Sequence, residues 1–212
     1  MLKGRRFSIL QENQKISKMK PVDKKQLLQH LENRVEGHIS EVIRHFQNMD
    51  DEILNKSSVS GGWSIAQCLD HLNSYGDYYL PLIVKKLETG SKYGDNPQFK
   101  GTWLGSYFIS MMEPETGRRK YKAFKGHIPD ADLNAPKVVA EFLRQQEMML
   151  MCLRKAEAKN LDKIKIPISI GKFICLRLGD VFQFIIAHNE RHIRQAQRNL
   201  VPQSRGIGQS RQ

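Results

Sequence analysis

Two histidines near the end of the chain have the spacing of a metal-binding pair. His188 and His192 stand four residues apart in an apolar-rich segment, residues 180–192. On a helix, side chains four residues apart emerge from one face, one turn apart, so both imidazoles can reach one ion. Catalytic zinc-type sites take three protein ligands and keep one coordination position open. The pair therefore predicts a divalent-metal site that needs a further ligand from elsewhere in the chain.

Five other histidines are present, and His71 is the best candidate for the third ligand. It lies beside the apolar stripe of a predicted helix, where a partner helix can meet it. His30, His38 and His45 fall near the edge of another apolar stripe, where surface or boundary positions are expected. His127 lies in a predicted loop and is not expected to bind metal.

An imidazole on a core-facing stripe needs a partner, because an unpaired polar group costs free energy away from water. Three neutral imidazoles that converge on one divalent cation satisfy this need together. The alternative is that His71, His188 and His192 are separate core-edge histidines, each hydrogen-bonded to a carbonyl or to water. Spacing alone leaves both interpretations open.

Four neighbouring side chains also have alternative interpretations. Gln195, just beyond the histidine pair, either hydrogen-bonds near the site or is an ordinary polar helix residue. Arg191 either orients an anionic substrate or is solvated, and Tyr75 either lines a pocket or only packs. Cys68 is a fourth ligand, a redox-sensitive thiol or, as is more common, an inert buried cysteine. No Ser-His-Asp or Cys-His-Asn signature and no glycine-rich phosphate loop is present, so no catalytic residue is assigned.

Four segments have the apolar periodicity of amphipathic helices. We expect them from residue 21 to about 50, from 64 to about 87, from 136 to about 158, and from 180 onward. A capping box of Ser64 and Gln67 predicts the start of the second helix. Asp180, with Gln183 in the capping-box position, is expected to cap the fourth.

The connections between these helices differ in length. Residues 90–135 form a long connection, which is unusual inside a compact domain and often functional. Within it we expect a short helix at 107–112, and we expect an extended return segment at 161–177. The pattern predicts an all-α fold, a four-helix bundle with a long insertion between helices 2 and 3. Ligand sites in such bundles lie between facing helices.

Two motifs together resemble a known family. The stretch 62–72, with the pair Gly179-Asp180, the spaced histidines and Gln195, resembles the DinB-like (YfiT-like) superfamily of metal-dependent bundle proteins. The resemblance covers roughly residues 25–200. The basic N-terminal extension and the 90–135 connection lie outside the core motif.

The resemblance implies a four-helix bundle with up-down-down-up topology and frequent homodimerisation. It also implies a divalent ion, which would be nickel, zinc, iron or manganese, held by three histidines. By the same resemblance, these ligands are His71, His188 and His192, and all three are present in this chain.

Charge and cysteine content narrow the class of protein. The formal net charge is +12, of which residues 1–20 carry +5 and residues 201–212 carry +2. We therefore expect a basic, disordered extension at 1–20, one domain at 21–200 and a disordered tail at 201–212, and not a nucleic-acid-binding surface. Three scattered cysteines favour a reducing cytoplasm. No apolar run reaches the ~18 residues of a membrane span.

The site predicts a metal-dependent enzyme acting on a small molecule, and the resemblance implies a thiol-dependent S-transferase or isomerase, or a metal-dependent hydrolase. Thiol-dependent S-transfer is slightly favoured over hydrolysis, because Glu190 lies roughly 200° around the helix from His188 and no other carboxylate is placed to act as a base. A low-molecular-weight thiol is a candidate cosubstrate. The alternative is a non-catalytic, stress-related binding or dimerisation module with a structural metal or none. Nucleic-acid binding through the basic tails ranks third.

Overall fold

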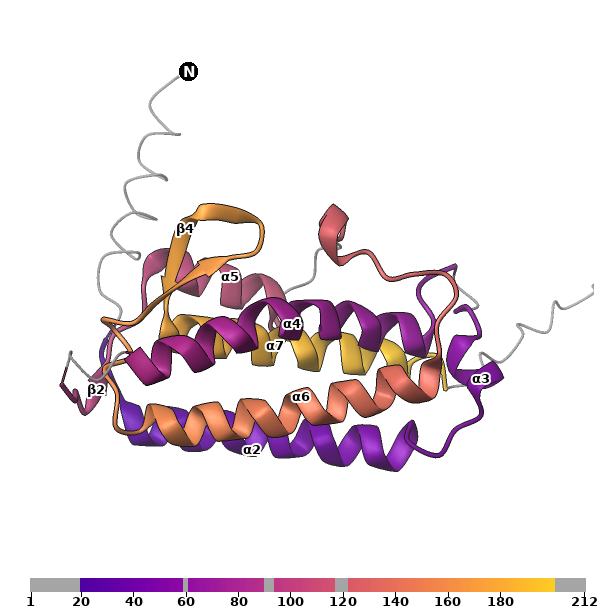
Figure 1. The fold of residues 1–212 in the computed structure, drawn as a ribbon, viewed down its shortest axis with the longest axis horizontal. Helices are drawn as coiled ribbons and strands as arrows, with labels where there is room; N and C mark the ends of the chain where they lie inside the picture. Colours follow the sequence, from indigo (N-terminus) through magenta and orange to yellow (C-terminus); the bar gives the residue numbers. More distant parts are fainter. Residues whose placement is uncertain (1–19, 59–60, 90–93, 117–121, 201–212) are drawn as a thin grey trace, which may run out of the picture.

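The computed structural model describes residues 20–58, 61–89, 94–116 and 122–200, and the structural statements below concern those residues. Most of them are helical, as the expected all-α class requires. The four longest described helices are α2 (Lys24–His45), α4 (Ile65–Thr89), α6 (Ala135–Ala156) and α7 (Leu178–Gln197) (Figure 1). The extension and the tail that we predicted to be disordered lie outside the described residues, apart from Lys20.

The first two long helices begin at local capping interactions. The Asp23 side chain accepts a hydrogen bond of 2.8 Å from the backbone N–H of Gln26 at the start of α2. α2 ends at His45, earlier than predicted, and a separate short helix α3 (Asp51–Asn55) follows. At α4 the predicted capping box is confirmed: the Gln67 N–H donates to Ser64 Oγ at 3.0 Å, and the Ser64 N–H donates to Gln67 Oε1 at 3.1 Å.

The long connection between α4 and α6 contains its own secondary structure. Strand β2 (Gln98–Phe99) pairs antiparallel with β1 (Val22–Asp23), and helix α5 (Trp103–Met112) and the 3-10 helix η2 (Lys125–His127) follow. The short helix predicted at 107–112 begins four residues earlier. Its start is capped by Thr102, whose Oγ1 accepts a hydrogen bond of 2.9 Å from the Gly105 N–H.

The return from α6 to α7 is extended, as predicted. Strands β3 (Lys165–Ile168) and β4 (Gly171–Arg177) form an antiparallel pair with an irregularity at Pro167/Ile168. In Figure 1 this β3–β4 pair, α5 and η2 lie on one side of the long helices. They contact α4 and α7, the helices that carry the predicted ligands.

The fourth long helix begins earlier than predicted, and Asp180 does not cap it. Arg177 is the N-cap residue and makes no side-chain capping bond. Asp180 lies in the first turn, fully buried, and its carboxylate accepts hydrogen bonds from N–H and Oγ1 of Thr102 at 3.1 and 2.7 Å. Gln183 donates to the Gly179 carbonyl and closes no capping box. The prediction was wrong because a partner 78 residues away takes the carboxylate.

The long helices share one interior that is divided into two apolar clusters. α4 packs against α6 and α7, and α2 packs against the same two helices. One cluster contains Tyr79 and Phe182, and the other contains Phe46 and Phe142. Along each helix the change from one cluster to the other falls at a buried polar side chain. These side chains are His38 on α2, Asn73 on α4, Gln146 on α6 and Asn189 on α7.

The described helices also bear on the membrane question. Among them, no helix is both long enough and apolar enough to cross a bilayer.

Candidate metal centre

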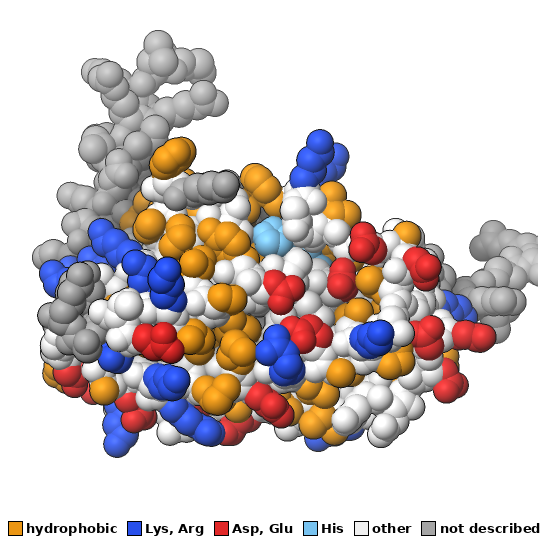
Figure 2. Space-filling view, viewed as in Figure 1, with side chains coloured by type: hydrophobic (Ala, Val, Ile, Leu, Met, Phe, Trp, Pro, Cys, Tyr) orange, Lys and Arg blue, Asp and Glu red, His pale blue; other side chains and the backbone are white. Residues whose placement is uncertain are grey.

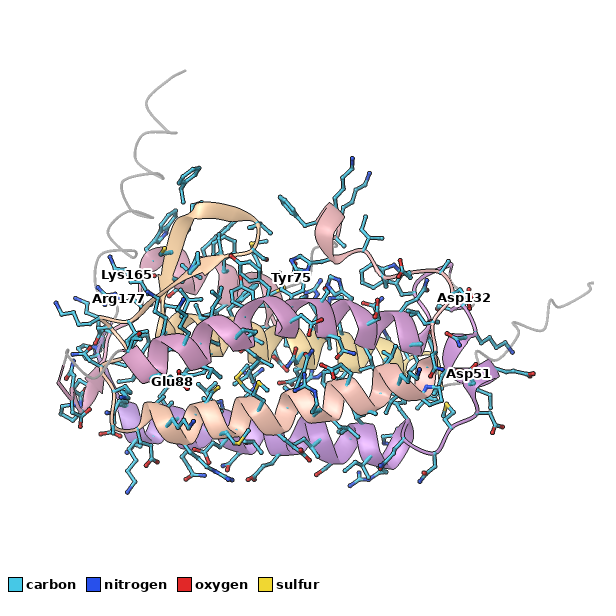
Figure 3. The ribbon with its side chains drawn as sticks, in the orientation of Figure 1. Asp51, Tyr75, Glu88, Asp132, Lys165 and Arg177 are labelled. Carbon is cyan, nitrogen blue, oxygen red and sulfur yellow. The ribbon has the colours of Figure 1, made fainter. Side chains whose placement is uncertain are left out.

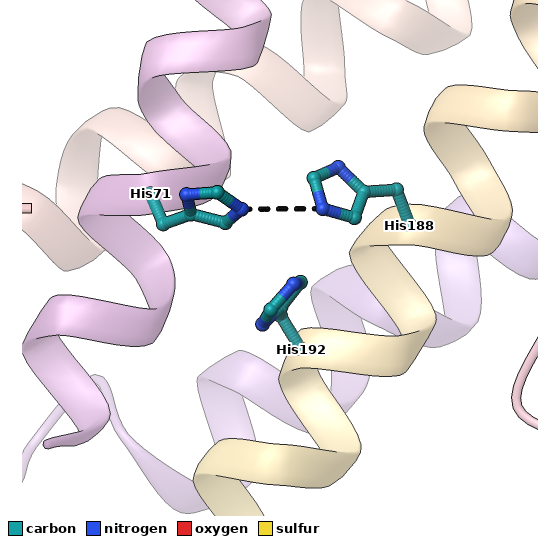
Figure 4. A group of neighbouring side chains, drawn as sticks. All are labelled: His71, His188 and His192. Carbon is teal, nitrogen blue, oxygen red and sulfur yellow. Dashed lines mark hydrogen bonds between the residues drawn. The ribbon is translucent and has the colours of Figure 1, made fainter. Parts of the chain in front are cut away.

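Three histidines from two neighbouring helices converge inside the molecule. His71 on α4 and His188 and His192 on α7 each place a ring nitrogen within 4.8 Å of the others. Nε2 of His71 lies 3.2 Å from Nε2 of His188 (Figure 4). His71 and His188 are buried, and His192 is half-buried. The structure thus brings together the three residues that spacing and resemblance had selected.

The orientation of the His71 ring is set by a main-chain group. Its Nδ1 lies 2.5 Å from the carbonyl oxygen of His127. A carbonyl oxygen can only accept, so Nδ1 carries the proton and donates it. Nε2 of the neutral ring then carries the lone pair, which points at Nε2 of His188, 3.2 Å away. Metal-binding histidines are commonly oriented in this way by a hydrogen bond from the second ring nitrogen.

The residue that provides this carbonyl is itself held in place. His127 is buried in η2, and its ring stacks on Tyr75 with the ring centroids 3.8 Å apart. Its Nδ1 lies 2.8 Å from Oγ of Ser74, which also bonds the His71 carbonyl. The His127 ring is not one of the three grouped imidazoles. Sequence reasoning treated His127 as an ordinary loop residue and missed this supporting role.

Burial keeps all three grouped imidazoles neutral. Loss of hydration lowers the pKa of His71 to about 4 and that of His192 to about 3, and it places the pKa of His188 well below its ordinary value. Nearby positive charge acts in the same direction, since Arg191 lowers the pKa of both His188 and His192. At neutral pH the three rings are therefore neutral, with one ring nitrogen of each free of a proton, which is the form that binds a metal ion.

Aromatic side chains surround the three imidazoles. The ring centroid of Trp63 lies 4.8 Å from that of His71, and the centroids of Tyr75 and Phe184 lie 4.6 and 5.9 Å from that of His188. Burial raises the pKa of Tyr75 to about 12, so its hydroxyl stays protonated. Tyr75, labelled in Figure 3, therefore lines the site as a neutral side chain. These rings make the surroundings of the three histidines largely apolar.

The other candidate neighbours have different positions. Arg191 donates to the Met111 carbonyl at the end of α5, at 3.3 Å. Gln195 lies within hydrogen-bonding reach of His192 and raises its pKa against the effect of burial. Cys68 is fully buried and does not join the group, and burial raises the pKa of its thiol to about 12. Of the interpretations that we considered for Cys68, the inert core residue fits this placement.

The three histidines of the first helix do not share one environment. His30 is exposed and His45 is half-buried, as expected for surface and boundary positions. His38 is 5 % exposed, and the buried Gln146 side chain on α6 lies beside its ring and raises its pKa against the larger effect of burial. The boundary position expected for His38 was wrong, because α2 is rotated so that this residue faces α6 and α7.

A charge network lies beside His188 and His192 on α7. Arg34 on α2 donates to Glu190 through Nε at 3.0 Å and to Glu113, next to α5, through Nη1 at 2.7 Å. Burial would raise the pKa of Glu190, but the bonds and charge of Arg34 outweigh it, and the pKa is lowered. The Glu190 carboxylate is thus ionised, and it accepts hydrogen bonds from Arg34. No local signal could reveal this pair, because 156 residues separate its members.

The face above the site is rich in apolar side chains. Figure 2 shows a histidine at the surface between the β3–β4 pair and η2, with hydrophobic side chains beside it. Several large apolar side chains on the segments that border this face are exposed: Trp103, Tyr107, Phe124, Ile128, Phe173 and Ile174.

The fold and the site together define a class of protein, a helical domain with three interior histidines able to hold one metal ion. The sequence model of the DinB superfamily matches residues 34–196, which is more than half of the chain, and the chain belongs to that superfamily. Neither the curated proteins nor the solved structures include a match to it.

Proposed function

We propose that this chain is a metal-dependent enzyme that acts on a small molecule, with a divalent ion held by His71, His188 and His192. The orientation of His71 carries the proposal, because the bond to the His127 carbonyl puts the proton on Nδ1 and turns the lone pair of Nε2 toward the other two imidazoles. The 3.2 Å between Nε2 of His71 and Nε2 of His188 is also suitable. Two nitrogens about 2.05 Å from one tetrahedral zinc ion would lie roughly 3.3 Å apart.

The donor set supports several metals. Imidazole suits nickel, zinc and iron, and manganese is the fourth candidate that we carry forward. Three protein ligands leave at least one position for a substrate atom, as in catalytic sites. A bound ion would supply Lewis-acid chemistry and lower the pKa of a coordinated thiol or water.

Among the chemistries open to such an ion, we propose thiol-dependent S-transfer ahead of hydrolysis. A hydrolase needs a base that takes a proton from water, whereas a thiol deprotonated at the ion needs none. In the described part of the chain, the group that could hold a metal contains no carboxylate. Glu190, which lies between His188 and His192 in the sequence, is paired with Arg34. The aromatic rings of Trp63, Tyr75 and Phe184 would keep water away from a bound thiolate.

Metal content of purified protein tests the site. We expect about one divalent ion per chain by elemental mass spectrometry, and its loss in each of His71→Ala, His188→Ala and His192→Ala. The exposed His30 provides the control, and His30→Ala should keep the ion. Adding the ion back to stripped wild-type protein should raise the melting temperature, since the ion binds the folded state. Full metal content after loss of any of the three imidazoles would refute the assignment.

Cobalt-substituted protein tests the choice of chemistry. Titration with L-cysteine should produce a sulfur-to-cobalt charge-transfer band in the wild type and none in His188→Ala. If L-cysteine does not change the spectrum of the cobalt protein, S-transfer through a metal-bound thiol is excluded. The proposed metal site is not affected by that result.

The overall topology is part of the proposal. We propose that α2, α4, α6 and α7 form a four-helix bundle with up-down-down-up order. Asp51 and Asp132, which precede α4 and α6, lie at one end of the molecule in Figure 3, and Glu88 near the end of α4 lies toward the other. Two helices that start at the same end need a long connection between them, and the 90–134 segment supplies it.

A binding or dimerisation module is the second candidate function. The exposed apolar side chains above the site favour it, because patches of this kind mark interaction surfaces. We propose a homodimer, which is compatible with either function. We also propose a cytoplasmic location, supported by three cysteines that are all free.

A further inference from the structure

A hydrogen bond between two helices crosses the interior of the molecule. Asn189, next in sequence to His188, donates through Nδ2 to Oε1 of Gln146 at 3.1 Å. Both side chains are 3 % exposed. α6 and α7 are not directly packed neighbours in the way that α4 and α7 are, so this bond reaches across the shared core. A small cavity of about 10 Å³ borders the pair and is also lined by Gln145 and Met149.

The next residue along α7 is bound to a third helix. Glu190 accepts two hydrogen bonds from the Arg34 guanidinium on α2, from Nε at 3.0 Å and from Nη2 at 2.5 Å. Three consecutive residues of α7 therefore meet three different helices. His188 meets α4, Asn189 meets α6 and Glu190 meets α2.

This arrangement constrains rotation of α7 about its own axis. Successive residues of an α-helix are about 100° apart, so the three contacts span about 200° of the helix circumference. Apolar packing is non-directional and tolerates small rotations, whereas hydrogen bonds weaken steeply as their angle departs from linear. A rotation that moved His188 away from His71 would also break the other two contacts.

We propose that Asn189 and Gln146, together with Arg34, are positioning residues that set the rotation of α7 so that His188 and His192 face His71. The inference rests on the proposed function, because it assigns these residues a role in metal affinity. Ligands must be held within about 0.5 Å of their productive places, and buried polar contacts that fix the register of a helix can supply that precision.

The test separates metal affinity from stability. In the double variant Asn189→Leu with Gln146→Met, the buried pair becomes two apolar side chains of similar volume. Such replacements are often neutral or stabilising for the fold, so the urea midpoint of the metal-stripped protein should stay the same or rise. Zinc affinity, measured by competition with a chromophoric chelator, should fall about 10-fold, the scale on which supporting residues affect metal sites.

Controls keep the outcomes distinct. Met149→Leu changes a neighbouring buried side chain on α6 without touching the hydrogen bond, and it should leave zinc affinity unchanged. Arg34→Met removes the α2 contact with Glu190, together with the pair between Arg34 and Glu113, and should also weaken zinc binding about 10-fold. If the double variant fails to fold, the zinc affinity of Arg34→Met tests the positioning role.

Each outcome has one meaning. Unchanged zinc affinity in the variants would overturn the positioning role and leave the metal site standing. Affinity and stability that fall together would assign these residues to the fold alone and would also overturn the inference. A wild-type protein that binds no zinc, nickel, iron or manganese would instead refute the proposed function.

Discussion

At the scale of single residues, the orientation of His71 depends on a main-chain carbonyl group and not on another side chain. The proton on His71 Nδ1 is directed to the main-chain carbonyl of His127. Every residue type offers the same carbonyl, so neither the type of residue 127 nor its place in a loop could predict the contact. What the residue type does contribute is the ring that stacks on Tyr75 and holds η2 against α4.

The buried His38 makes the free energy of unfolding depend on pH below neutrality. Burial lowers its pKa to about 4 from an ordinary value of 6.5, while Glu190 and a hydrogen bond with Gln146 raise it, and Arg34 and Arg194 lower it, by smaller amounts. Between these pH values the unfolded chain binds a proton that the folded chain does not, so stability present above about pH 6.5 is lost as the pH falls toward 4. The shift corresponds to about 3 kcal/mol.

We therefore expect His38→Leu to gain stability over wild type as the pH falls. The difference in unfolding free energy between the two proteins should grow by about 3 kcal/mol between pH 7.5 and pH 4. Urea unfolding of metal-stripped samples measures it, and the three site histidines cancel because both proteins contain them. A difference that is the same at both pH values would show that His38 does not stay neutral in the folded state.

At the scale of elements, the long connection is fastened to α7 through the Gly179-Asp180 pair. Asp180 accepts two hydrogen bonds from Thr102, and a Cβ added at Gly179 would lie 2.6 Å from the Phe99 ring. Burial raises the pKa of Asp180 despite the opposing effect of those bonds. The pair is thus explained by the docking of β2 and α5 against α7, and not by helix capping.

Close approach of α5 to α7 predicts that Gly105 cannot carry a side chain. A Cβ at this position would lie 2.2 Å from Cγ of Asp180, so Gly105→Ala should destabilise the protein by about 1–3 kcal/mol through overpacking. The matched control is Gly37→Ala in α2, where nothing lies within 4 Å of the added Cβ. That exposed helical site should gain about 0.5–1 kcal/mol. Equal urea midpoints for the two variants would contradict the docking of α5 on α7.

At the scale of the whole molecule, the apolar face above the three grouped histidines predicts self-association. Phe173 is 103 % exposed in the β3–β4 pair, and Trp103 and Phe124 on neighbouring segments are more than half exposed. A homodimer that buries this face should become monomeric in Phe173→Glu. Light scattering after size-exclusion chromatography gives the mass, and Lys165→Glu, a change of exposed charge on β3, serves as the control. A wild-type monomer, or a Phe173→Glu dimer, would contradict this interface.

The sequence by itself determined the helices and the candidate ligands. Apolar periodicity and the Ser64 capping box are local properties, so α4, α6 and most of α2 could be predicted with their approximate limits. The spacing of His188 and His192 is equally local, since residues four apart share a helix face wherever that helix packs. His71 could be added because its place beside an apolar stripe and the family motif agreed.

The tertiary structure alone decided how the helix faces meet. The rotation of α2 buried His38, the docking of α5 took Asp180 away from a cap, and the return of the long connection placed the His127 carbonyl on His71. Each of these contacts joins residues far apart in the chain, and each depends on helix rotation and loop path. Local propensity carries no information about either, because hydrophobic burial selects an apolar face without specifying which partner covers it.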